Sequence, residues 1–354
     1  MKKFSYKVLG VMSGTSLDGI DLAVVNFTKE DSWKFEIEDA ETIPYPVEWK
    51  DQLSRAIEYG EDLLNNLNEE YTRYLASIIS TYLKKRSIYG LDAICSHGHT
   101  IKHEPQNMYT LQIGNLPLLA QLLQHKIVCD FRVQDVQLGG QGAPLVPIGD
   151  QLLFSQYKYC LNLGGFANIS TERGNSRIAY DVAPVNTVLN YYAEKLGHFY
   201  DAGGQIASSG KLIDDLFIQL GALPFYNQDP PKSLGIEWVN AEILPLLRNY
   251  ESDVPSILNT FCQHVASQIT RVLDNSEDSE ILITGGGSYN TFLLQQIKAR
   301  TKNRIIVPTD EIVNFKEALI FGLLGVLKLR GEINVLSSVT GAERDHSSGV
   351  IFEP

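Results

Sequence analysis

The sequence predicts an α/β fold of two domains, each opening with a β-meander and carrying helices on its sheet faces. The order strand, glycine turn, strand begins at Tyr6 and begins again at Tyr157, and helical segments follow each time. The length of 354 residues also corresponds to two domains, at roughly 150 residues each. We therefore expect an N-terminal domain over residues 1–150 and a C-terminal domain over residues 151–354.

The first half begins with a predicted hairpin over residues 6–27, whose two strands flank the turn SGTSLDG at Ser13–Gly19. A third strand is expected at residues 34–43. Apolar residues then recur at helical intervals between Pro46 and Arg86, which predicts helices. Later apolar runs predict strands at residues 91–96, 109–113 and 126–131, with a helix at residues 116–124.

The second half repeats this order of elements without appreciable sequence identity. Its meander consists of predicted strands at residues 157–163, 166–171 and 177–183, of which the first two are joined by Gly164 and Gly165. Helices are expected at residues 187–196, 211–220 and 254–274. A strand at 280–284, a helix at 291–300, a strand at 304–308 and a helix at 315–329 complete the pattern.

Composition excludes several classes of partner and location. The chain has 30 Lys and Arg against 42 Asp and Glu, a net charge of −12 without a basic cluster, so neither nucleic acid nor a membrane surface is an expected partner. The longest apolar run, residues 318–327, is too short to span a bilayer. The N-terminus lacks a signal-peptide pattern, and the four widely spaced cysteines indicate reduced core residues. We expect a cytoplasmic protein.

Three glycine turns stand directly after apolar strands, at residues 13–19, 163–166 and 284–290. Glycine removes Cβ where the backbone must approach another group, and a helix N-terminus after such a turn can bind an anion. A single turn of this kind is more often a tight hairpin or a helix cap. The three together resemble the arrangement of actin, hexokinase and heat-shock-chaperone ATPases, in which two hairpins hold the phosphates and the late turn holds the adenosine.

Longer strings make the resemblance specific. GVMSGTSLDGIDLAVV at Gly10–Val25 resembles the opening signature of the anhydro-N-acetylmuramic acid kinase family. Further strings follow in family order up to residue 342: SHGHTIKHEP, TLQIGN, GGQGAPLVP, LNLGGFANIS, GGGSYN and SVTGA. The resemblance thus implies two actin-like (ribonuclease H-like) domains with a cleft between them.

The resemblance also implies an activity. Family members use ATP to open the 1,6-anhydro ring of anhydro-N-acetylmuramic acid with water and to phosphorylate O6, which gives N-acetylmuramic acid 6-phosphate for peptidoglycan recycling. By similarity, Asp181 is the catalytic base that takes the proton of the water. By its residue type alone, Asp181 would more often be a turn or cap residue before Pro184, and only its position in the family pattern favours the catalytic role.

The nucleotide-binding residues implied by the resemblance come from the three turns. They are Gly14, Thr15, Ser16, Leu17, Asp18, Gly19, Ile20 and Asp21 in the first, Gly164 and Gly165 in the second, and Gly285, Gly286, Gly287 and Asn290 in the third. Mg²⁺ is an expected cofactor beside ATP, contacted through bound water by Asp18 or Asp21. Many superfamily members carry an Asp where this chain has Met12, so the choice between the two acids stays open.

Expected substrate residues are His97, Gln112, Asn115, Arg132, Asp135 and Glu317. Amides suit hydroxyl and acetamide groups, and arginine suits the lactyl carboxylate. His103 and Glu104 match the family pattern as well. Three histidines at 97, 99 and 103 also raise a zinc site as the weaker alternative, because no carboxylate or cysteine completes a recognised spacing. For Glu317, a favourable first-turn charge on a helix is the alternative role.

This chain departs from the family pattern on the expected sugar side. His99 replaces Gln, Val133 and Gln134 replace two Arg residues, and Leu234 and Ile236 lie in KSLGIE where the family has Lys-Ser-Thr-Gly-Arg-Glu. Ala183 and Val185 replace two glycines beside Asp181, and both side chains disfavour positive φ. We therefore expect the loop after Asp181 to take another path.

Two alternatives to the leading function stay open at this point. One is a kinase for a different amino sugar or sugar acid, in which Asp181 deprotonates a substrate hydroxyl. The other is a non-kinase ATP-binding module of the same superfamily, which would be expected to carry an added peptide-binding domain. The family resemblance further implies a homodimer.

Overall fold

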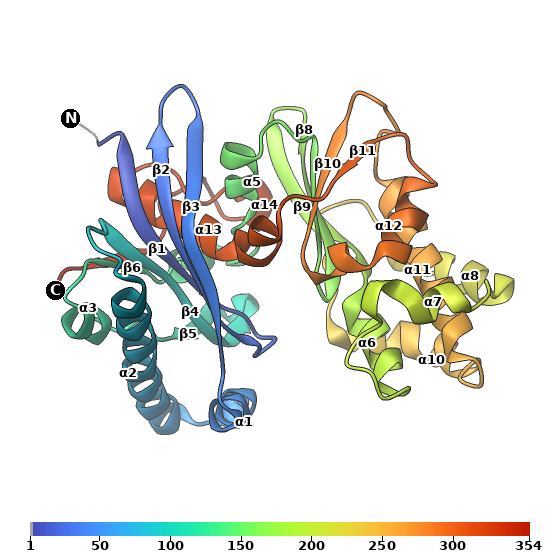
Figure 1. The fold of residues 1–354 in the computed structure, drawn as a ribbon, viewed down its shortest axis with the longest axis horizontal. Coiled ribbons are helices and arrows are strands. Elements are labelled where there is room, and N and C mark those ends of the chain that lie inside the picture. Colours follow the sequence, from blue (N-terminus) through green and yellow to red (C-terminus); the bar gives the residue numbers. More distant parts are fainter. Residues whose placement is uncertain (1–2) are drawn as a thin grey trace. The chain divides into compact units, whose positions relative to one another are not determined.

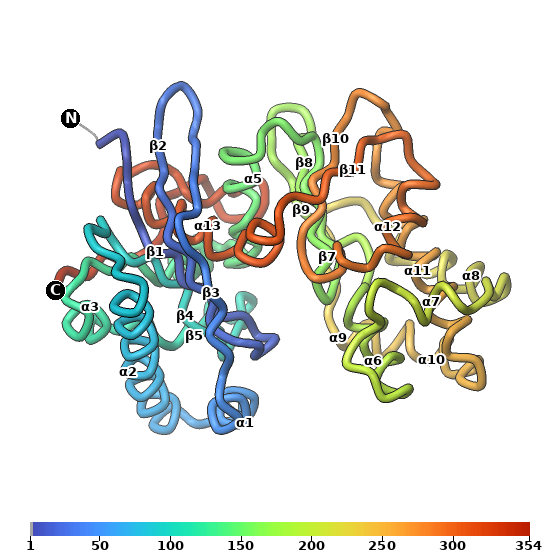
Figure 2. The backbone as a smooth tube through the Cα atoms, viewed as in Figure 1, coloured from blue at the N-terminus to red at the C-terminus, as the bar shows by residue number. Residues whose placement is uncertain are grey.

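The computed structural model describes residues 3–354, which form two compact units (Figure 1). The first unit contains the chain up to Leu153 together with Phe315–Pro354, and the second contains Phe154–Asn314. The C-terminal 40 residues therefore belong to the first unit, whereas the sequence pattern assigned them to the second. Figure 2 traces this return of the chain from the second unit to the first.

The first unit is built on one mixed sheet. Its strands are β1 Ser5–Ser13, β2 Gly19–Lys29, β3 Trp33–Pro44, β4 Ala93–Glu104, β5 Tyr109–Ile113, β6 Ile127–Cys129 and β12 Val350–Phe352. The sheet order is β12-β6-β4-β1-β2-β3, with β5 paired to β4. β1 to β3 form an antiparallel meander, while β4 pairs parallel with β1 and β6 pairs parallel with β4.

Helices cover both faces of this sheet. They are α1 Val47–Arg55, α2 Glu61–Arg86, α3 Leu118–Leu123, α4 Val133–Gln137, α5 Pro147–Leu153, α13 Asp310–Arg330 and α14 Ser337–Thr340. Leu9 and Val11 of β1 share a core with α2 and α3. Their neighbour Gly10 faces α13, because a Cβ on Gly10 would lie 2.0 Å from the Ala318 carbonyl oxygen.

The same close packing explains why the last segment joins the first unit. α13 presents small residues to the sheet, and a Cβ on Gly325 would lie 2.1 Å from the Cys95 sulfur. β12 then adds to the sheet edge by pairing antiparallel with β6. Apolar periodicity predicts the helix but not the sheet against which it packs, since that choice depends on the fit of two surfaces distant in sequence.

The second unit repeats the strand order of the first. Its strands are β7 Tyr159–Leu163, β8 Phe166–Arg173, β9 Ser176–Pro184, β10 Glu280–Thr284 and β11 Arg304–Ile306, in the order β11-β10-β7-β8-β9. β7 to β9 form the meander and β10 and β11 run parallel to β7. Each unit thus has a meander followed by two parallel strands on the far side of its first strand. This repeat confirms the predicted α/β class with two ribonuclease H-like sheets.

The helices of the second unit are α6 Asn186–Glu194, α7 Gln205–Ser209, α8 Asp214–Gly221, α9 Ile236–Trp238, α10 Leu244–Arg248, α11 Val254–Arg271 and α12 Thr291–Lys298. Leu161, Leu163 and Ile169 of the sheet share a core with α6, α8, α11 and α12. Asn168 and Asp181 pair across β8 and β9 on the opposite face. Alternation along the strand therefore turns Asp181 away from the helical core.

Candidate active site

The first glycine turn, between β1 and β2, combines two kinds of glycine. A Cβ on Gly19 would lie 2.5 Å from the Ile43 carbonyl oxygen, so glycine is required there by the close approach of β3. Gly14 has room for a side chain, its nearest neighbour being Ser16 Oγ at 3.5 Å. Leu17 takes the left-handed conformation at φ 59° and donates its N–H to the Gly14 carbonyl at 3.3 Å. Thr15 and Ser16 are exposed at the tip.

The two acids of this turn sit close enough to influence each other. Asp21 Oδ1 accepts a hydrogen bond from Thr42 Oγ1 at 2.6 Å. Burial raises the pKa of Asp21, the Thr42 bond opposes this, and the negative charge of Asp18 raises the pKa further. A nearby cation would offset the rise in the pKa of Asp21 that burial and the Asp18 charge cause. The pair therefore fits a hydrated Mg²⁺ ion contacted through water.

Beneath the turn, a chain of buried polar groups supports β1. Ser13 Oγ lies 2.8 Å from His99 Nδ1 and 2.7 Å from the Tyr45 hydroxyl, which lies 2.5 Å from the Tyr71 hydroxyl. Burial lowers the pKa of His99 to about 4, so the imidazole stays neutral at physiological pH. His99, which stands where the family has Gln, thus belongs to a hydrogen-bonded network under the turn.

His97 holds Arg132 in place. Its Nδ1 lies 2.9 Å from the Gly98 carbonyl oxygen, and its Nε2 accepts the Arg132 Nε–H at 2.9 Å. Burial, and next the positive charge of Arg132, keep the pKa of His97 well below its usual range. Arg132 also donates Nη1 to the Gly142 carbonyl at 2.7 Å. Both His97 nitrogens are occupied, so its place in the structure is to orient Arg132, where the sequence suggested direct substrate contact.

Asp135 is fully buried, and both of its oxygens are bonded to the chain. Oδ2 accepts the Gly142 N–H at 2.6 Å and Oδ1 accepts the Thr340 hydroxyl at 2.7 Å. A Cβ on Gly140 would lie 2.2 Å from Oδ2. The carboxylate therefore ties the glycine-rich loop to the C-terminal segment. This geometry assigns Asp135 to the scaffold, where the sequence suggested a substrate ligand.

Two amides of the first unit have acceptors without a partner in the described part of the chain. Gln112 donates to Thr110 Oγ1 at 2.8 Å, and Asn115 donates to the His97 carbonyl at 3.2 Å. Gln112 Oε1 and Asn115 Oδ1 are both buried and lack a hydrogen-bond partner among residues 3–354. An unsatisfied buried acceptor is costly unless a ligand or water supplies the donor. These two oxygens are therefore suited to hydroxyl or amide donors of a sugar.

Glu317 lies on α13, next to a buried ion pair between Lys316 Nζ and Asp150 Oδ1 at 2.7 Å. Surrounding protein raises the pKa of Glu317, although its side chain keeps an exposed surface. Arg132 opposes that rise and Asp21 adds to it. Burial lowers the pKa of Arg132 to about 10, against the attraction of Glu317. Arg132, Glu317 and Asp21 thus form one electrostatic group within the first unit.

In the second unit, the Gly164–Gly165 turn is fixed by the start of α6. The Gly165 carbonyl accepts the N–H groups of Val185 at 2.8 Å and Thr187 at 3.2 Å, and the Gly164 carbonyl accepts the Asn186 N–H at 3.3 Å. A Cβ on Gly165 would lie 2.8 Å from Thr187 Oγ1. The Gly164 N–H donates to the Phe166 carbonyl at 3.2 Å, so the Gly165 N–H is the amide of this turn left for an anion.

Asp181 has one oxygen fixed and one open. Its Oδ2 accepts the Leu234 N–H at 2.8 Å, and its own N–H donates to the Lys232 carbonyl at 3.1 Å. Burial raises the pKa of Asp181, and the Leu234 bond opposes that rise. A carboxylate with a raised pKa, a fixed orientation and a free oxygen fits a general base.

At the two positions beside Asp181 where this chain lacks the family's glycines, the backbone does not take positive φ. Ala183 lies within β9, and Val185 has φ −131°, so neither adopts positive φ. Val185 is fully buried in the core of the second unit. The segment KSLGIE also differs from the family pattern, yet it supplies the Leu234 N–H through its backbone. That contact is independent of the side chain at position 234.

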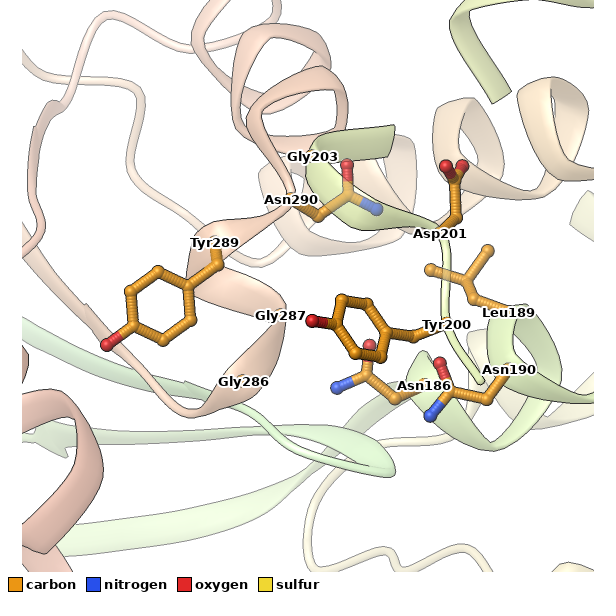
Figure 3. Close-up of a pocket in the computed structure, with 10 residues that line it drawn as sticks. All are labelled: Asn186, Leu189, Asn190, Tyr200, Asp201, Gly203, Gly286, Gly287, Tyr289 and Asn290. Carbon is orange, nitrogen blue, oxygen red and sulfur yellow. The ribbon is translucent and has the colours of Figure 1, made fainter. Parts of the chain in front are cut away.

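A pocket of about 320 Å³ lies beside the third glycine turn (Figure 3). Its lining residues are Asn186, Leu189, Asn190, Tyr200, Asp201, Gly203, Gly286, Gly287, Tyr289 and Asn290. Tyr200 and Tyr289 are 64% and 44% exposed, and the Tyr200 hydroxyl points toward Gly286 and Gly287 (Figure 3). Two exposed aromatic rings with amides nearby are suited to a flat heteroaromatic ring.

The glycines of this turn differ in what they permit. Gly285 has φ +82°, and a Cβ would lie 2.5 Å from Asn162 Oδ1. Gly287 packs against Leu163, whereas Gly286 meets nothing closer than 3.8 Å and is free to line the pocket. Asn290 accepts the Leu293 N–H at 2.9 Å and thereby caps α12. Its side chain is therefore occupied by the helix, although it also borders the pocket.

Several residues of these sites were missed by sequence reasoning. Tyr200 and Asn190 come from segments without a family string, and Ser13 was seen only as part of a turn. An exposed tyrosine beside Gly203 and Gly204 is the one local signal that could have pointed to the pocket.

The weaker zinc alternative has no support among the described residues. No group of three His, Cys, Asp or Glu in residues 3–354 could hold a metal ion. His103, the third histidine, lies with Nδ1 3.0 Å from Thr110 Oγ1. Within the same residues, no helix has the length and apolar character needed to cross a membrane.

Comparison with known sequences gives matches over nearly the full chain. A family model described as anhydro-N-acetylmuramic acid kinase matches residues 6–354. The anhydro-N-acetylmuramic acid kinase of Mannheimia succiniciproducens is 34% identical, covering 97% of this chain and 98% of that protein. Those of Shewanella loihica and Bacillus cereus (strain Q1) are each 32% identical, covering 99% and 98% of this chain and 99% of each relative.

Solved structures with a similar chain path are more distant. The component A of (R)-2-hydroxyglutaryl-CoA dehydratase from Acidaminococcus fermentans is 12% identical with a TM-score of 0.49, covering 92% of this chain and 99% of that chain. A ROK family glucokinase from Streptomyces griseus, in complex with glucose and AMPPNP, is 11% identical with a TM-score of 0.42, covering 90% and 99%.

Proposed function

The chain belongs to the anhydro-N-acetylmuramic acid kinase family, ATP-dependent sugar kinases of cell-wall recycling, and from that premise we propose how its own residues carry out the reaction. Water adds to the anomeric carbon of 1,6-anhydro-N-acetylmuramic acid, the bond from that carbon to O6 breaks, and O6 takes the γ-phosphoryl group of ATP. The products are N-acetylmuramic acid 6-phosphate and ADP.

The observation that carries this proposal is the state of Asp181. Its free oxygen accepts the proton of the attacking water, while the Leu234 N–H holds the other oxygen and fixes the carboxylate plane. Because O6 leaves the ring as the acceptor of the phosphoryl group, it needs no proton from the protein. One base is therefore sufficient for the coupled reaction.

The nucleotide is held mainly by backbone groups. The tip of the first turn at residues 14–16 and the Gly165 N–H donate to phosphate oxygens, which suits a chain of net charge −12. The pocket beside Gly286 takes the adenosine, with Tyr200 and Tyr289 against the base. Asp18 and Asp21 are the residues that would hold Mg²⁺, which would neutralise phosphate charge.

The sugar contacts come from the groups with open hydrogen-bonding capacity. Gln112 Oε1 and Asn115 Oδ1 accept from sugar hydroxyl or acetamide groups. Arg132, oriented by His97, binds the lactyl carboxylate, and Glu317 orients a hydroxyl. We further propose that the enzyme works as a homodimer in the cytoplasm, where ATP is supplied; sedimentation velocity on the purified protein measures the first of these.

The test is an ATP-consumption assay with 1,6-anhydro-N-acetylmuramic acid in oxygen-18 water, with the product analysed by mass. The expected product carries one heavy oxygen at the anomeric carbon, and Asp181→Asn abolishes its formation. Asp214→Asn, a change of the same type in the first turn of α8, is the matched control and keeps full activity. A phosphorylated product without heavy oxygen would instead support a kinase that needs no hydrolytic water.

A further inference from the structure

A second pocket of the second unit lies on the opposite face of β9 from Asp181. It has a volume of about 250 Å³ and is lined by Tyr180 and Val182 of β9, by residues 226–230 and Lys232, and by Gln268, Arg271 and Val272 at the C-terminal end of α11. Tyr180 pairs with Ile169 on the core face of the sheet, whereas Asp181 pairs with Asn168 on the other face. The residues proposed above for catalysis and for nucleotide binding do not line it.

Two cations in this pocket lack a carboxylate partner. Lys232 Nζ donates to the Phe225 carbonyl at 3.2 Å, and Arg271 Nη2 donates to Asn227 Oδ1 at 2.9 Å; no ion pair of either side chain occurs within residues 3–354. Burial lowers the pKa of Lys232, Arg271 lowers it further, and Asp229 opposes the shift. The Asp229 carboxylate also lines the pocket, so Lys232 and Arg271 leave one net positive charge there, which favours binding of an anion.

Two buried neutral side chains also present unused polar atoms to the pocket. Tyr226 is 6% exposed, and its hydroxyl has no hydrogen-bond partner among the described residues. Gln268 is 7% exposed, and its side-chain amide forms no hydrogen bond with the described chain. Buried hydroxyl and amide groups are ordinarily satisfied. Together with the cations they give up to four side chains that can donate to the oxygens of one small ligand.

We propose that this pocket binds a small phosphate-bearing anion, either inorganic phosphate or the phosphate group of a sugar phosphate. Lys232 and Arg271 pair with its charge, and Tyr226 and Gln268 donate to its remaining oxygens. The volume is near the lower end of small-molecule pockets, about 300 Å³, which limits the ligand to a compact one. Bidentate arginine contact favours the tetrahedral phosphate oxygens over a halide.

The pocket is connected to the catalytic face through one short segment. Lys232, whose side chain lines the pocket, accepts the Asp181 N–H through its carbonyl, and Leu234 donates its N–H to Asp181 Oδ2. An anion that fixes the Lys232 side chain therefore also fixes the segment that orients the carboxylate. This second statement rests on the proposed role of Asp181, whereas the binding statement does not.

Binding is tested by calorimetric titration of the full chain with inorganic phosphate and, separately, with glucose 6-phosphate. A saturating non-hydrolysable ATP analogue with Mg²⁺ occupies the nucleotide site during the titration. We expect wild-type binding in the millimolar range or tighter, weakened about tenfold or more in Arg271→Gln. Arg248→Gln is the matched control, because Arg248 ends α10 as Arg271 ends α11 and is likewise exposed. Equal affinities in wild type and Arg271→Gln, or no binding by wild type, overturn the proposal.

The two ligands distinguish the sources of the phosphate group. Tighter binding of glucose 6-phosphate identifies a sugar phosphate, and binding of inorganic phosphate alone identifies the free ion. At saturating ATP, phosphate should change kcat in wild type but not in Arg271→Gln. Identical kcat with and without phosphate overturns the connection to Asp181 while the calorimetry stands. Absence of kinase activity contradicts the proposed function and leaves the calorimetry to decide the pocket.

Discussion

Asp135 in the first unit and Asp181 in the second were both expected in the active site, and the structure holds them in opposite ways. Asp135 is fully buried, with Oδ1 bonded to Thr340 and Oδ2 bonded to Gly142. Asp181 is half-buried, with Oδ2 bonded to Leu234 and Oδ1 open. A carboxylate with both oxygens bonded to the chain stabilises the fold, whereas one with an open oxygen can accept a proton.

The difference follows from the position of each residue in its unit. Asp135 lies beneath the C-terminal segment, which the first unit receives as an extra layer from a distant part of the chain. Asp181 lies on β9, the last strand of its sheet, and the short segment at residues 232–234 hydrogen-bonds to it. Two sheets of the same strand order therefore give one closed polar site and one open one.

The largest expected effect is the loss of kcat on substitution of Asp181, the carboxylate with an open oxygen. Asp181→Asn keeps the size of the side chain and removes its basicity, so kcat should fall by about 10²- to 10⁴-fold. The melting temperature should change little, because an amide oxygen can still accept the Leu234 N–H. Steady-state kinetics with a thermal melt measure both. A stable variant with near wild-type kcat would place the base elsewhere.

For Asp135 we expect the opposite pattern, a loss of stability with little change in substrate binding. Asp135→Ala leaves the Gly142 N–H and the Thr340 hydroxyl without their acceptor, which should lower the free energy of unfolding by about 2–4 kcal/mol. Below the melting temperature, KM for the sugar should stay close to that of wild type. Urea titration followed by circular dichroism gives the first quantity. A large rise in KM with unchanged stability would return Asp135 to the substrate site.

Substitutions in the third glycine turn test whether nucleotide binding in the second unit depends on backbone conformation. Gly285→Ala places a Cβ at positive φ and against Asn162, so we expect about 1–3 kcal/mol of strain and weaker ATP binding. Gly286→Ala is the matched control, because its Cβ would meet nothing closer than 3.8 Å. Nucleotide titration and thermal melts on both variants separate the two positions. Equal behaviour of the two would contradict the assigned backbone requirement.

His99, in the hydrogen-bonded network under the first turn, makes the stability of the protein depend on pH. Its pKa is about 4 in the folded protein and 6.5 as the reference value, so the unfolded chain binds the proton first as pH falls. Stability from this group is present above pH 6.5 and is lost as pH falls toward 4. Between pH 7 and pH 5 the loss amounts to about 2 kcal/mol, and His99→Gln should remove it. Exposed His198→Gln is the control and should leave the pH dependence unchanged.

The smallest expected effect is a shift in the pH dependence of kcat. Leu234→Pro removes the N–H that stabilises the charged form of Asp181, so the pKa of Asp181 should rise and the acidic limb of kcat should move to higher pH. Leu234→Ala keeps the N–H and should leave the limb in place. Rate profiles from pH 4 upward compare the two. Coincident limbs in the two variants would show that this bond does not set the pKa.

Local patterns in the sequence predicted most of the secondary structure. The strands at residues 109–113 and 280–284 agree with the structure at both ends, because alternating or continuous apolar runs between turns identify buried strands. The continuation of β4 through His97 to Glu104 was not predicted as strand, since its polar residues hide the pattern. β12 was missed as well, because three residues at an exposed edge carry little apolar signal.

The sequence by itself determined the fold class, the three glycine turns, the family and the residue proposed as base, since each depends on short-range patterns or on strings that survive intact. Only the tertiary structure decided which polar groups are open for chemistry. The hydrogen bond of Asp135 with Thr340 joins residues 205 apart in sequence, and that of His97 with Arg132 joins residues 35 apart. Local sequence patterns therefore predict neither bond. Hydrogen-bond satisfaction is a property of pairs, and the pairs are made only when distant segments pack together.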